Sequence, residues 1–227
     1  MRIVAVVAVA VCCLVACGSD PLDECLESLD PVGHFDCSYQ DFTGVDLSGR
    51  DLRNVDLSNA DLEQANLTGV NLDFANLTDA NLAGANLAGA TGWRPSLYRA
   101  NLAGADLTGA SLTLANLTKT NLTQADLTDA NLSAVDLWRA NLTQADLSGA
   151  NLTGANLLWA NLTGADLTGA DLSSANLPKA DLSGANLTGA DLSWAAFHWV
   201  EGTGAKADDE TVWPEGFDPV AAGVIFD

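Results

Sequence analysis

A five-residue unit repeats almost without interruption through residues 41–199. A typical unit reads Ala-Asn-Leu-Thr-Gly, as in residues 150–154. Leucine stands at the centre of every unit from Leu47 to Leu192 except at Gly92. The residue two places earlier is nearly always Ala or Val. The residue just before the leucine is Asp or Asn in nearly every unit, and Ser or Thr usually follows the leucine.

The period of five excludes the two regular secondary structures. On an α-helix, residues five apart are displaced by about 140°, so the leucines would spread around the whole surface. On a flat strand, an odd spacing would send successive leucines to opposite faces. A coil that turns a corner every five residues keeps one Leu and one small Ala of each unit inside. The sequence therefore predicts a solenoid in which each coil covers the apolar face of the next.

The motif Ala-(Asp/Asn)-Leu-X-X over residues 41–199 resembles that of the pentapeptide repeat family. The resemblance implies an all-β fold, a right-handed quadrilateral β-helix in which four pentapeptides make one coil of 20 residues. Residues 41–200 would then form about eight coils. Stacked at roughly 4.8 Å, these coils make a rod about 38 Å long. We expect short caps at its N- and C-terminal ends.

The first residues have the pattern of an export signal. Arg2 supplies a positive charge, and Ile3–Val11 is an apolar run too short to span a bilayer. Leu14–Cys17 resembles a bacterial lipobox, which implies removal of residues 1–16 and acylation of Cys17, which would then bind membrane lipid. An ordinary signal peptide and a buried apolar start are the alternatives. We expect an extracytoplasmic protein anchored by lipid to a bacterial cell membrane; which membrane is left open.

Residues 17–40 contain a pair of cysteines that would remain after lipidation. Cys25 and Cys37 form an even set in an exported segment, which favours a disulfide. Metal binding by these cysteines and His34 is the alternative, but no fourth ligand is evident and the spacing fits no common zinc pattern. We therefore predict a disulfide that closes residues 18–40 into a cap over the first coil, and no metal site.

The amino-acid composition argues against two classes of function, nucleic-acid binding and catalysis. The net charge of −21 over 227 residues and a pI near 4.1 disfavour nucleic acid as a partner, because phosphate binding depends on clustered Lys and Arg. His34 and His198 are the two histidines, and neither lies beside an obvious nucleophile. Abundant Asp and Ser are explained by the repeat. We expect one solenoid domain with short flanks, no cofactor and no enzymatic activity.

The repeat falters at residues 91–95. Gly92 replaces the central leucine, and Pro95 replaces the inward alanine and lacks a backbone donor. Because Leu97 resumes at a multiple of five, two interpretations remain. Either one coil is locally irregular, or the five residues loop outward and the next unit takes the vacated side.

The last segment, residues 200–227, is predicted to be a C-terminal cap. The repeat stops after Val200, and residues 211–219 resemble a segment that often closes pentapeptide repeat proteins. We expect Trp213 and Phe217 to cover the leucines of the last coil.

The outward positions carry an unusual side. With 20 residues per coil, positions 20 apart lie above one another, and on the side that begins at Leu97 they are bulky or basic. This candidate binding surface, called here the aromatic/basic stripe, consists of Tyr98, Arg99, Lys119, Trp138, Arg139, Trp159, Lys179 and Trp199. If residues 91–95 loop out, Asp73-Phe74 and Arg53-Asn54 join the same side. The opposite side has an aspartate column: Asp106, Asp126, Asp146 and Asp166.

Exposed aromatic and Arg residues on a rigid scaffold are typical of interfaces. We therefore predict a rigid binding or spacer module whose stripe takes a protein or glycan partner. Coverage of the stripe by residues 200–227, or mere sequence drift, is the alternative. A purely structural envelope component is a second possible function. A DNA-mimic regulator of a DNA gyrase-like enzyme, known within the resembled family, is a third and is disfavoured by export. Oligomeric state is left open.

Overall fold

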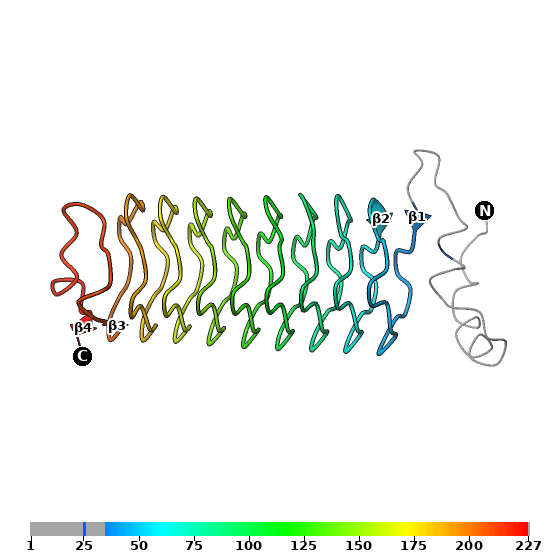
Figure 1. The fold of residues 1–227 in the computed structure, drawn as a ribbon, viewed down its shortest axis with the longest axis horizontal. Helices are drawn as coiled ribbons and strands as arrows, with labels where there is room; N and C mark the ends of the chain where they lie inside the picture. Colours follow the sequence, from blue (N-terminus) through cyan, green and yellow to red (C-terminus); the bar gives the residue numbers. More distant parts are fainter. Residues whose placement is uncertain (1–24, 26–34, 227) are drawn as a thin grey trace, which may run out of the picture.

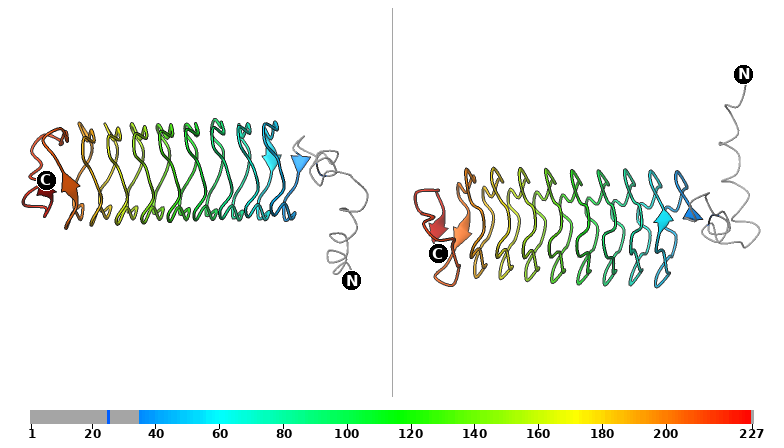
Figure 2. Two further views of the ribbon diagram at one scale, coloured as in Figure 1. Left: turned by 60° about the horizontal axis from the view of Figure 1, so that its bottom comes forward. Right: turned by 90° about the horizontal axis from the view of Figure 1, so that it is seen from above.

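The structure, a computed structural model, describes Cys25 and residues 35–226. The described chain forms a straight rod of stacked, four-sided coils, a right-handed β-helix (Figure 1). Two further views show the coils edge-on along the same axis (Figure 2). The predicted signal segment 1–16, the predicted lipidation site Cys17 and His34 fall outside the described residues.

Backbone hydrogen bonds join each coil to the next at a spacing of 20 residues. The amide of Leu147 donates to the carbonyl of Asp166 at 2.7 Å, and the amide of Asp166 donates to the carbonyl of Ala145 at 2.9 Å. The same parallel bridges recur on every side of the described rod. The expected repeat of four pentapeptides per coil is confirmed.

Each side of a coil is nearly straight for only one or two residues, so few named strands result. They are β1 (Phe35–Asp36), β2 (Val55–Asp56), β3 (Lys206–Ala207) and β4 (Ile225–Phe226). β1 pairs in parallel with β2 near the N-terminal end, and β3 pairs in parallel with β4 at the C-terminal end.

The interior is a column of leucines lined by alanines. Every central leucine from Leu47 to Leu192 is at most 1% exposed, and the alanines two places earlier are buried beside them. Burying one leucine side chain contributes about 1.5–3 kcal/mol. The predicted inward positions are therefore confirmed, and their sum explains how a rod without helices holds together.

The residue before each leucine, except at Ser96 and Ser111, is Asp or Asn because its side chain closes the turn. Its Oδ1 accepts a hydrogen bond from the backbone N–H two residues later, as Asp126 does from Thr128 at 2.9 Å. Asparagine adds a bond between coils, as when Asn101 Nδ2 donates to Asn81 Oδ1 at 3.0 Å. The abundant acidic and amide residues are therefore parts of the turns.

Residues 91–95 stay within the coil. The amide of Gly92 donates to the carbonyl of Ser111 at 2.7 Å, and Thr91 bridges both neighbouring coils. A Cβ on Gly92 would lie 3.1 Å from Cγ of Pro95 and 3.3 Å from Leu112. The buried proline ring thus fills the space of the missing leucine, and one irregular coil results. The side containing Phe74 is consequently not a continuation of the stripe.

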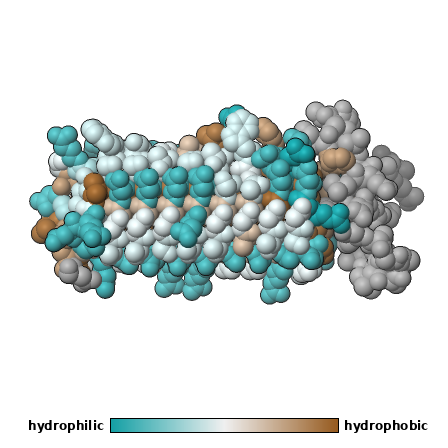
Figure 3. Space-filling view, viewed as in Figure 1, coloured by the Kyte–Doolittle hydropathy of each residue, from teal (hydrophilic) through white to brown (hydrophobic). Residues whose placement is uncertain are grey.

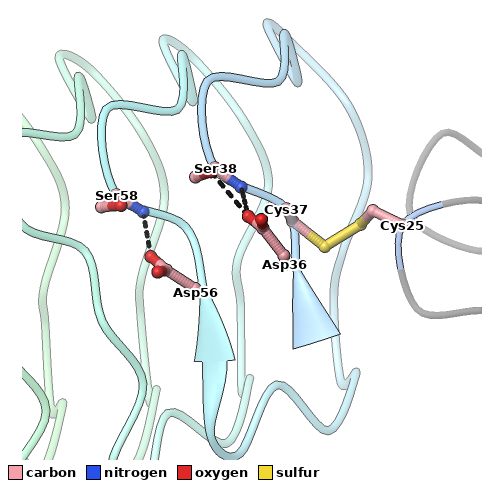
Figure 4. Close-up of a disulfide and its surroundings, with 6 residues drawn as sticks. All are labelled: Cys25, Asp36, Cys37, Ser38, Asp56 and Ser58. Carbon is pink, nitrogen blue, oxygen red and sulfur yellow. Dashed lines mark hydrogen bonds between the residues drawn. A yellow bond between two sulfur atoms is a disulfide. The ribbon is translucent and has the colours of Figure 1, made fainter. Parts of the chain in front are cut away.

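The N-terminal end of the rod begins before residue 41. Cys37 lies 20 residues before Leu57, occupies the leucine position and is fully buried. A disulfide joins it to Cys25, with Cα atoms 5.2 Å apart (Figure 4). Asp36 accepts from the amide of Ser38 at 3.0 Å, the same turn that Asp56 makes in the coil above. The coil geometry therefore reaches into the segment that we expected to form only the cap.

The C-terminal end also continues beyond the sequence repeat. Glu201 bridges Asp181 and Lys206 bridges Asn186 at the usual spacing, and Val212 then bridges Asp191 after one inserted residue. The expectation that the repeat ends at 200 holds for the motif but not for the coil.

Three aromatic rings close this end. Trp213 and Phe217 stack with centroids 5.3 Å apart, and both rings contact Phe197 edge-on. Leu182, Leu187 and Val224 line the same enclosed apolar space. Trp213 and Phe217 therefore cover the last leucines, and the C-terminal cap lies on the end of the rod (Figure 1).

Candidate functional site

The aromatic/basic stripe projects from turn corners of the coil. The last residue of each unit, two places after the leucine, is the turn residue and has a left-handed backbone conformation with φ near 60°. Glycine adopts this conformation without cost, whereas other L-residues do so at some cost. Each of the other three turn columns includes glycine, as at Gly104, Gly149 and Gly154.

The stripe column contains no glycine. Its turn residues over the described coils are Tyr39, Asn59, Asp79, Arg99, Lys119, Arg139, Trp159, Lys179 and Trp199. All of them have φ between 56° and 63°. The column therefore keeps a less favourable backbone residue in every coil, whereas the columns of Gly104 and Gly149 repeatedly use glycine and the column of Gly154 uses it once.

The stripe side chains interleave as alternating cations and rings. The guanidinium of Arg139 lies 4.6 Å from the ring centroid of Trp138 and 5.8 Å from that of Trp159. The ammonium of Lys119 lies 5.3 Å from Trp138, and that of Lys179 lies 4.1 Å from Trp159. Each distance is within the reach of a cation–π interaction.

The same alternation extends to both ends of the stripe. Lys119 and Arg99 lie 5.8 and 5.9 Å from the ring of Tyr98, and Lys179 lies 6.0 Å from that of Trp199. The structure thus brings together all eight stripe residues predicted from the spacing. Sequence reasoning gave the column but not the contacts between successive coils.

Exposure leaves this surface open to a partner. Trp159 is 45% exposed and Trp199 is 78% exposed, so the C-terminal cap does not cover them. Arg99 forms an ion pair with Asp79 at 2.9 Å. No carboxylate of the described chain forms an ion pair with Lys119, Arg139 or Lys179. These three cations therefore face outward with aromatic rings as their charge partners.

With this geometry in place, comparison with known proteins identifies the repeat. A family model described as pentapeptide repeats matches eight copies within residues 41–91 and 96–200. The chain belongs to the pentapeptide repeat family. A search of curated protein sequences gives no match.

Two solved pentapeptide repeat structures illustrate the likeness. HetL, described as involved in heterocyst differentiation regulation in the cyanobacterium Nostoc sp., is 35% identical over 84% of this chain and 86% of its own, with a TM-score of 0.50. QnrB1, described as a plasmid-mediated fluoroquinolone resistance protein, is 19% identical over 86% of this chain and 91% of its own, with a TM-score of 0.65. The QnrB1 likeness shows the fold alone.

Acidic residues of the pentapeptide repeat coils lie mainly away from the stripe. The aspartate column is stacked as predicted, with Asp126 bridging Asp106 on one side and Asp146 on the other. Hydrogen bonds from the hydroxyl and the backbone N–H of Thr128 hold the pKa of Asp126 below its usual value. The corner that follows the stripe carries neutral residues such as Gln124 and Gln144 in the middle coils.

A second aromatic group, which the sequence analysis did not predict, lies in the irregular coil. Phe74 and Trp93 meet edge-on with centroids 5.0 Å apart, and Arg94 lies 5.3 Å from the Trp93 ring. Phe74, Trp93 and Leu114 are each at least 41% exposed. The 20-residue spacing of Phe74, Arg94 and Leu114 was the available signal. In Figure 3, apolar side chains gather at a few places on a surface of regular polar rows.

Other kinds of site are not found in the described part of the chain. No group of three or more His, Cys, Asp or Glu residues there is placed to hold a metal ion. His198 is exposed beside Trp199, with ring centroids 6.1 Å apart. Among residues 25 and 35–226, no helix is long and apolar enough to cross a membrane.

Proposed function

We propose that this pentapeptide repeat protein is a lipid-anchored, extracytoplasmic binding module that contacts its partner through the aromatic/basic stripe. The observation that carries the proposal is the unbroken alternation of cations and rings from Arg99 to Trp199. The protein itself is of a structural or binding type, as its family and fold indicate. We infer no catalytic role for it.

The turn conformations support a functional reason for the stripe. A left-handed conformation costs an L-residue on the order of 1–2 kcal/mol relative to the right-handed one. Such strain gathers at functional sites. Arg139, Trp159 and Lys179 occupy three successive turns of this kind, where the column on the opposite side uses Gly149, Gly169 and Gly189. In the described coils the stripe column has no glycine, and the adjacent column of Gly154 has one.

The scaffold suits binding because it is already ordered. Each stripe residue stands on a coil that is hydrogen-bonded to both neighbours, as Arg139 is through its amide to Leu158 at 3.1 Å. The side chains are further held by cation–π contacts. Ordering them on association therefore costs little conformational entropy, which favours affinity.

The stripe also bears on the alternative functions. A DNA mimic presents acidic groups to its partner, whereas this candidate surface presents Arg and Lys. QnrB1 resembles this chain at 19% identity, so its resistance role gives no support for the same role here. A purely structural spacer needs neither the cations nor the rings, and it serves as the outcome to be excluded by experiment.

The binding proposal is tested by capture from solubilised membranes. Wild type is compared with a Trp138→Ala/Trp159→Ala variant and with Leu114→Ala, an exposed apolar truncation at the same kind of turn. We expect a specific protein or glycan-bearing partner, or bound lipid, to be retained by wild type and Leu114→Ala and lost from the double variant. Equal recovery with all three proteins would point to a spacer instead.

The anchoring proposal is tested separately. Cys17→Ser should abolish incorporation of labelled fatty acid and release the protein from the membrane fraction. Continued membrane association of this variant, together with no lipid uptake by wild type, would remove the argument for lipid anchoring and for an extracytoplasmic location.

A further inference from the structure

Two of the stripe rings, Trp138 and Trp159, each lie between two cations of the same chain. Trp138 has Lys119 at 5.3 Å and Arg139 at 4.6 Å from its centroid. Trp159 has Arg139 at 5.8 Å and Lys179 at 4.1 Å. A sugar ring that stacks on an aromatic residue needs an open face. Trp138 and Trp159 are therefore poorly suited to glycan stacking, and the stripe presents its rings together with cationic groups.

Aromatic rings beside Lys and Arg match the chemistry of a bilayer interface. Trp and Tyr concentrate at the level of lipid headgroups, because their rings are apolar and carry a polar group. Lys and Arg on the same side are attracted to anionic lipids. The stripe combines Tyr98, Trp138, Trp159 and Trp199 with cations between them.

The shape of the stripe fits a flat partner. Its residues lie on turn corners of a straight rod, and positions 98 to 198 cover five coil spacings. At roughly 4.8 Å each, these spacings make a row about 24 Å long. A peptide is usually held in a groove or at a free sheet edge. A straight row of projecting side chains meets a planar surface along its whole length.

Charge is distributed so that the acidic protein can approach an anionic surface on this side. The aspartate column, including Asp126 and Asp146, lies on the opposite side of the same coils. The screening length is about 8 Å at physiological salt, so charges across the rod weigh less at the surface than the stripe cations do. Lys119, Arg139 and Lys179 have no described carboxylate partner to neutralise them.

We propose that the stripe binds the anionic headgroup surface of the membrane that holds the anchor, so that the rod lies along the membrane instead of projecting from it. The inference rests on the proposed anchoring and binding function and names its partner. A cation near an anionic surface improves binding about fivefold, so three give on the order of a hundredfold. That is weak for a free protein. A protein tethered by its lipid anchor is already at high effective concentration near the membrane. The same contact is therefore enough to hold the rod along the membrane surface.

The chain provides a built-in probe, because it contains three lysines. Lys119 and Lys179 belong to the stripe, and Lys206 is an exposed residue that continues the column of Asp166 and Asn186 on the opposite side. Full-length protein is reconstituted into vesicles of phosphatidylcholine alone or with anionic phosphatidylglycerol. Labelling by an amine-specific reagent is then measured at each lysine by mass spectrometry.

With anionic vesicles we expect labelling of Lys119 and Lys179 to fall by at least about fivefold relative to neutral vesicles, the factor for one cation, with Lys206 unchanged. Raising the salt concentration should restore it, because the attraction is electrostatic. Arg139→Gln should weaken the protection. Arg53→Gln is the matched control, since it removes one charge from a residue that pairs with Asp51 at 2.6 Å and lies off the stripe.

Labelling in isolated cell envelopes separates the two proposals. Protection of Lys119 and Lys179 in envelopes but not in anionic vesicles would overturn the lipid proposal and leave the binding function with another macromolecule. Equal labelling of all three lysines in both settings would overturn the lipid contact and the proposed binding function together. Protection in both, lost from Arg139→Gln and kept in Arg53→Gln, is the expected result.

Discussion

The stripe and the aspartate column stand on opposite sides of the same coils, and beneath the surface they are alike. Leu137 under the stripe and Leu147 under the aspartate column are both fully buried. Their amides donate to the next coil at 2.8 and 2.7 Å. The two sides differ in the residues that face outward. Packing and pairing therefore do not explain why one side is cationic and aromatic and the other acidic.

The turn residues make the difference sharper. On the aspartate side the turns use Gly109, Gly149, Gly169 and Gly189, with Asp129 between them. On the stripe side the same backbone conformation is held by Arg, Lys and Trp. One side follows the preference of the backbone, whereas the other departs from it in successive coils. The stripe side, where the turn residues depart from that preference, is therefore the side on which a function independent of folding is expected.

The largest effect is expected in the interior, where the two sides should behave alike. Leu137→Asp and Leu147→Asp each bury a carboxylate without a partner, which costs several kcal/mol. Both should lower the melting temperature by more than 10 °C or prevent folding. Thr143→Asp, at a half-exposed outward position, should change it by no more than about 2 °C. Similar losses for all three variants would contradict the assigned inward and outward positions.

This uniform interior explains why the fold was predictable from the sequence. A period of five with leucine at the centre leaves one arrangement that buries every leucine, and 20 residues per coil places the stripe in one column. Other features depend on contacts between non-equivalent residues. The filling of the Gly92 site by Pro95, the use of Cys37 as a leucine substitute and the coil beyond Val200 required the structure.

The stripe was likewise predictable from the sequence in part only. Its eight residues follow from spacing alone, because every coil has the same length. The order in which cations and rings alternate depends on side-chain directions at left-handed turns, which the spacing does not give. The sequence therefore located the candidate site but did not show that Lys119 reaches the rings of two different coils.

Acid should act on the carboxylate-rich sides and not on the stripe cations. Hydrogen bonds from Thr128 hold the pKa of Asp126 below its usual value. Burial raises the pKa of Asp181, but hydrogen bonds from the hydroxyl and backbone of Ser183 outweigh it, so that this pKa too is lowered. The ionised forms therefore stabilise the fold above the unfolded pKa of about 3.9, and this stability is lost as pH falls through the lower folded values.

We expect a melting temperature that is nearly flat from pH 7 to 5 and falls by at least a few °C below about pH 4. Circular dichroism during heating at a series of pH values measures it. Asp126→Asn should slightly reduce the fall in melting temperature below pH 4, because the amide oxygen accepts the same hydrogen bond and the amide does not titrate. Arg139→Gln should leave the fall in melting temperature below pH 4 unchanged. A melting temperature that rises below pH 4 would show that charge repulsion outweighs these hydrogen bonds.

Truncating the stripe rings should have a small effect on folding. Trp159→Ala removes two cation–π contacts, each worth about 0.5–1 kcal/mol at an exposed site. We expect a loss of about 1 kcal/mol, measured by urea unfolding. Leu114→Ala, at the same kind of turn without such contacts, should lose less. A loss above about 3 kcal/mol for Trp159→Ala would indicate that the ring is covered in the free protein, and would weaken the case for a binding surface.

The smallest expected effect is a gain of stability on the aspartate side. In the same column, Asn66 donates to Asp46 at 2.9 Å and Asn186 donates to Asp166 at 3.3 Å. Asp146 instead lies between two other carboxylates, Asp126 and Asp166. Asp146→Asn keeps the oxygen that accepts from Ser148 and adds a donor toward Asp126, so it should stabilise the fold by about 0.2–1 kcal/mol.

The stripe side provides the matched control for this last change. Asp136 already accepts from Asn156 at 2.9 Å and from the amide of Trp138 at 3.1 Å, and it bridges the neutral residues Asn116 and Asn156. Asp136→Asn relieves no repulsion between stacked carboxylates and removes the negative charge that receives the Asn156 donor. It should therefore be neutral or slightly destabilising in thermal unfolding. Equal gains in stability from Asp136→Asn and Asp146→Asn would show that the effect comes from the overall net charge. They would contradict the assignment of the effect to locally stacked carboxylates.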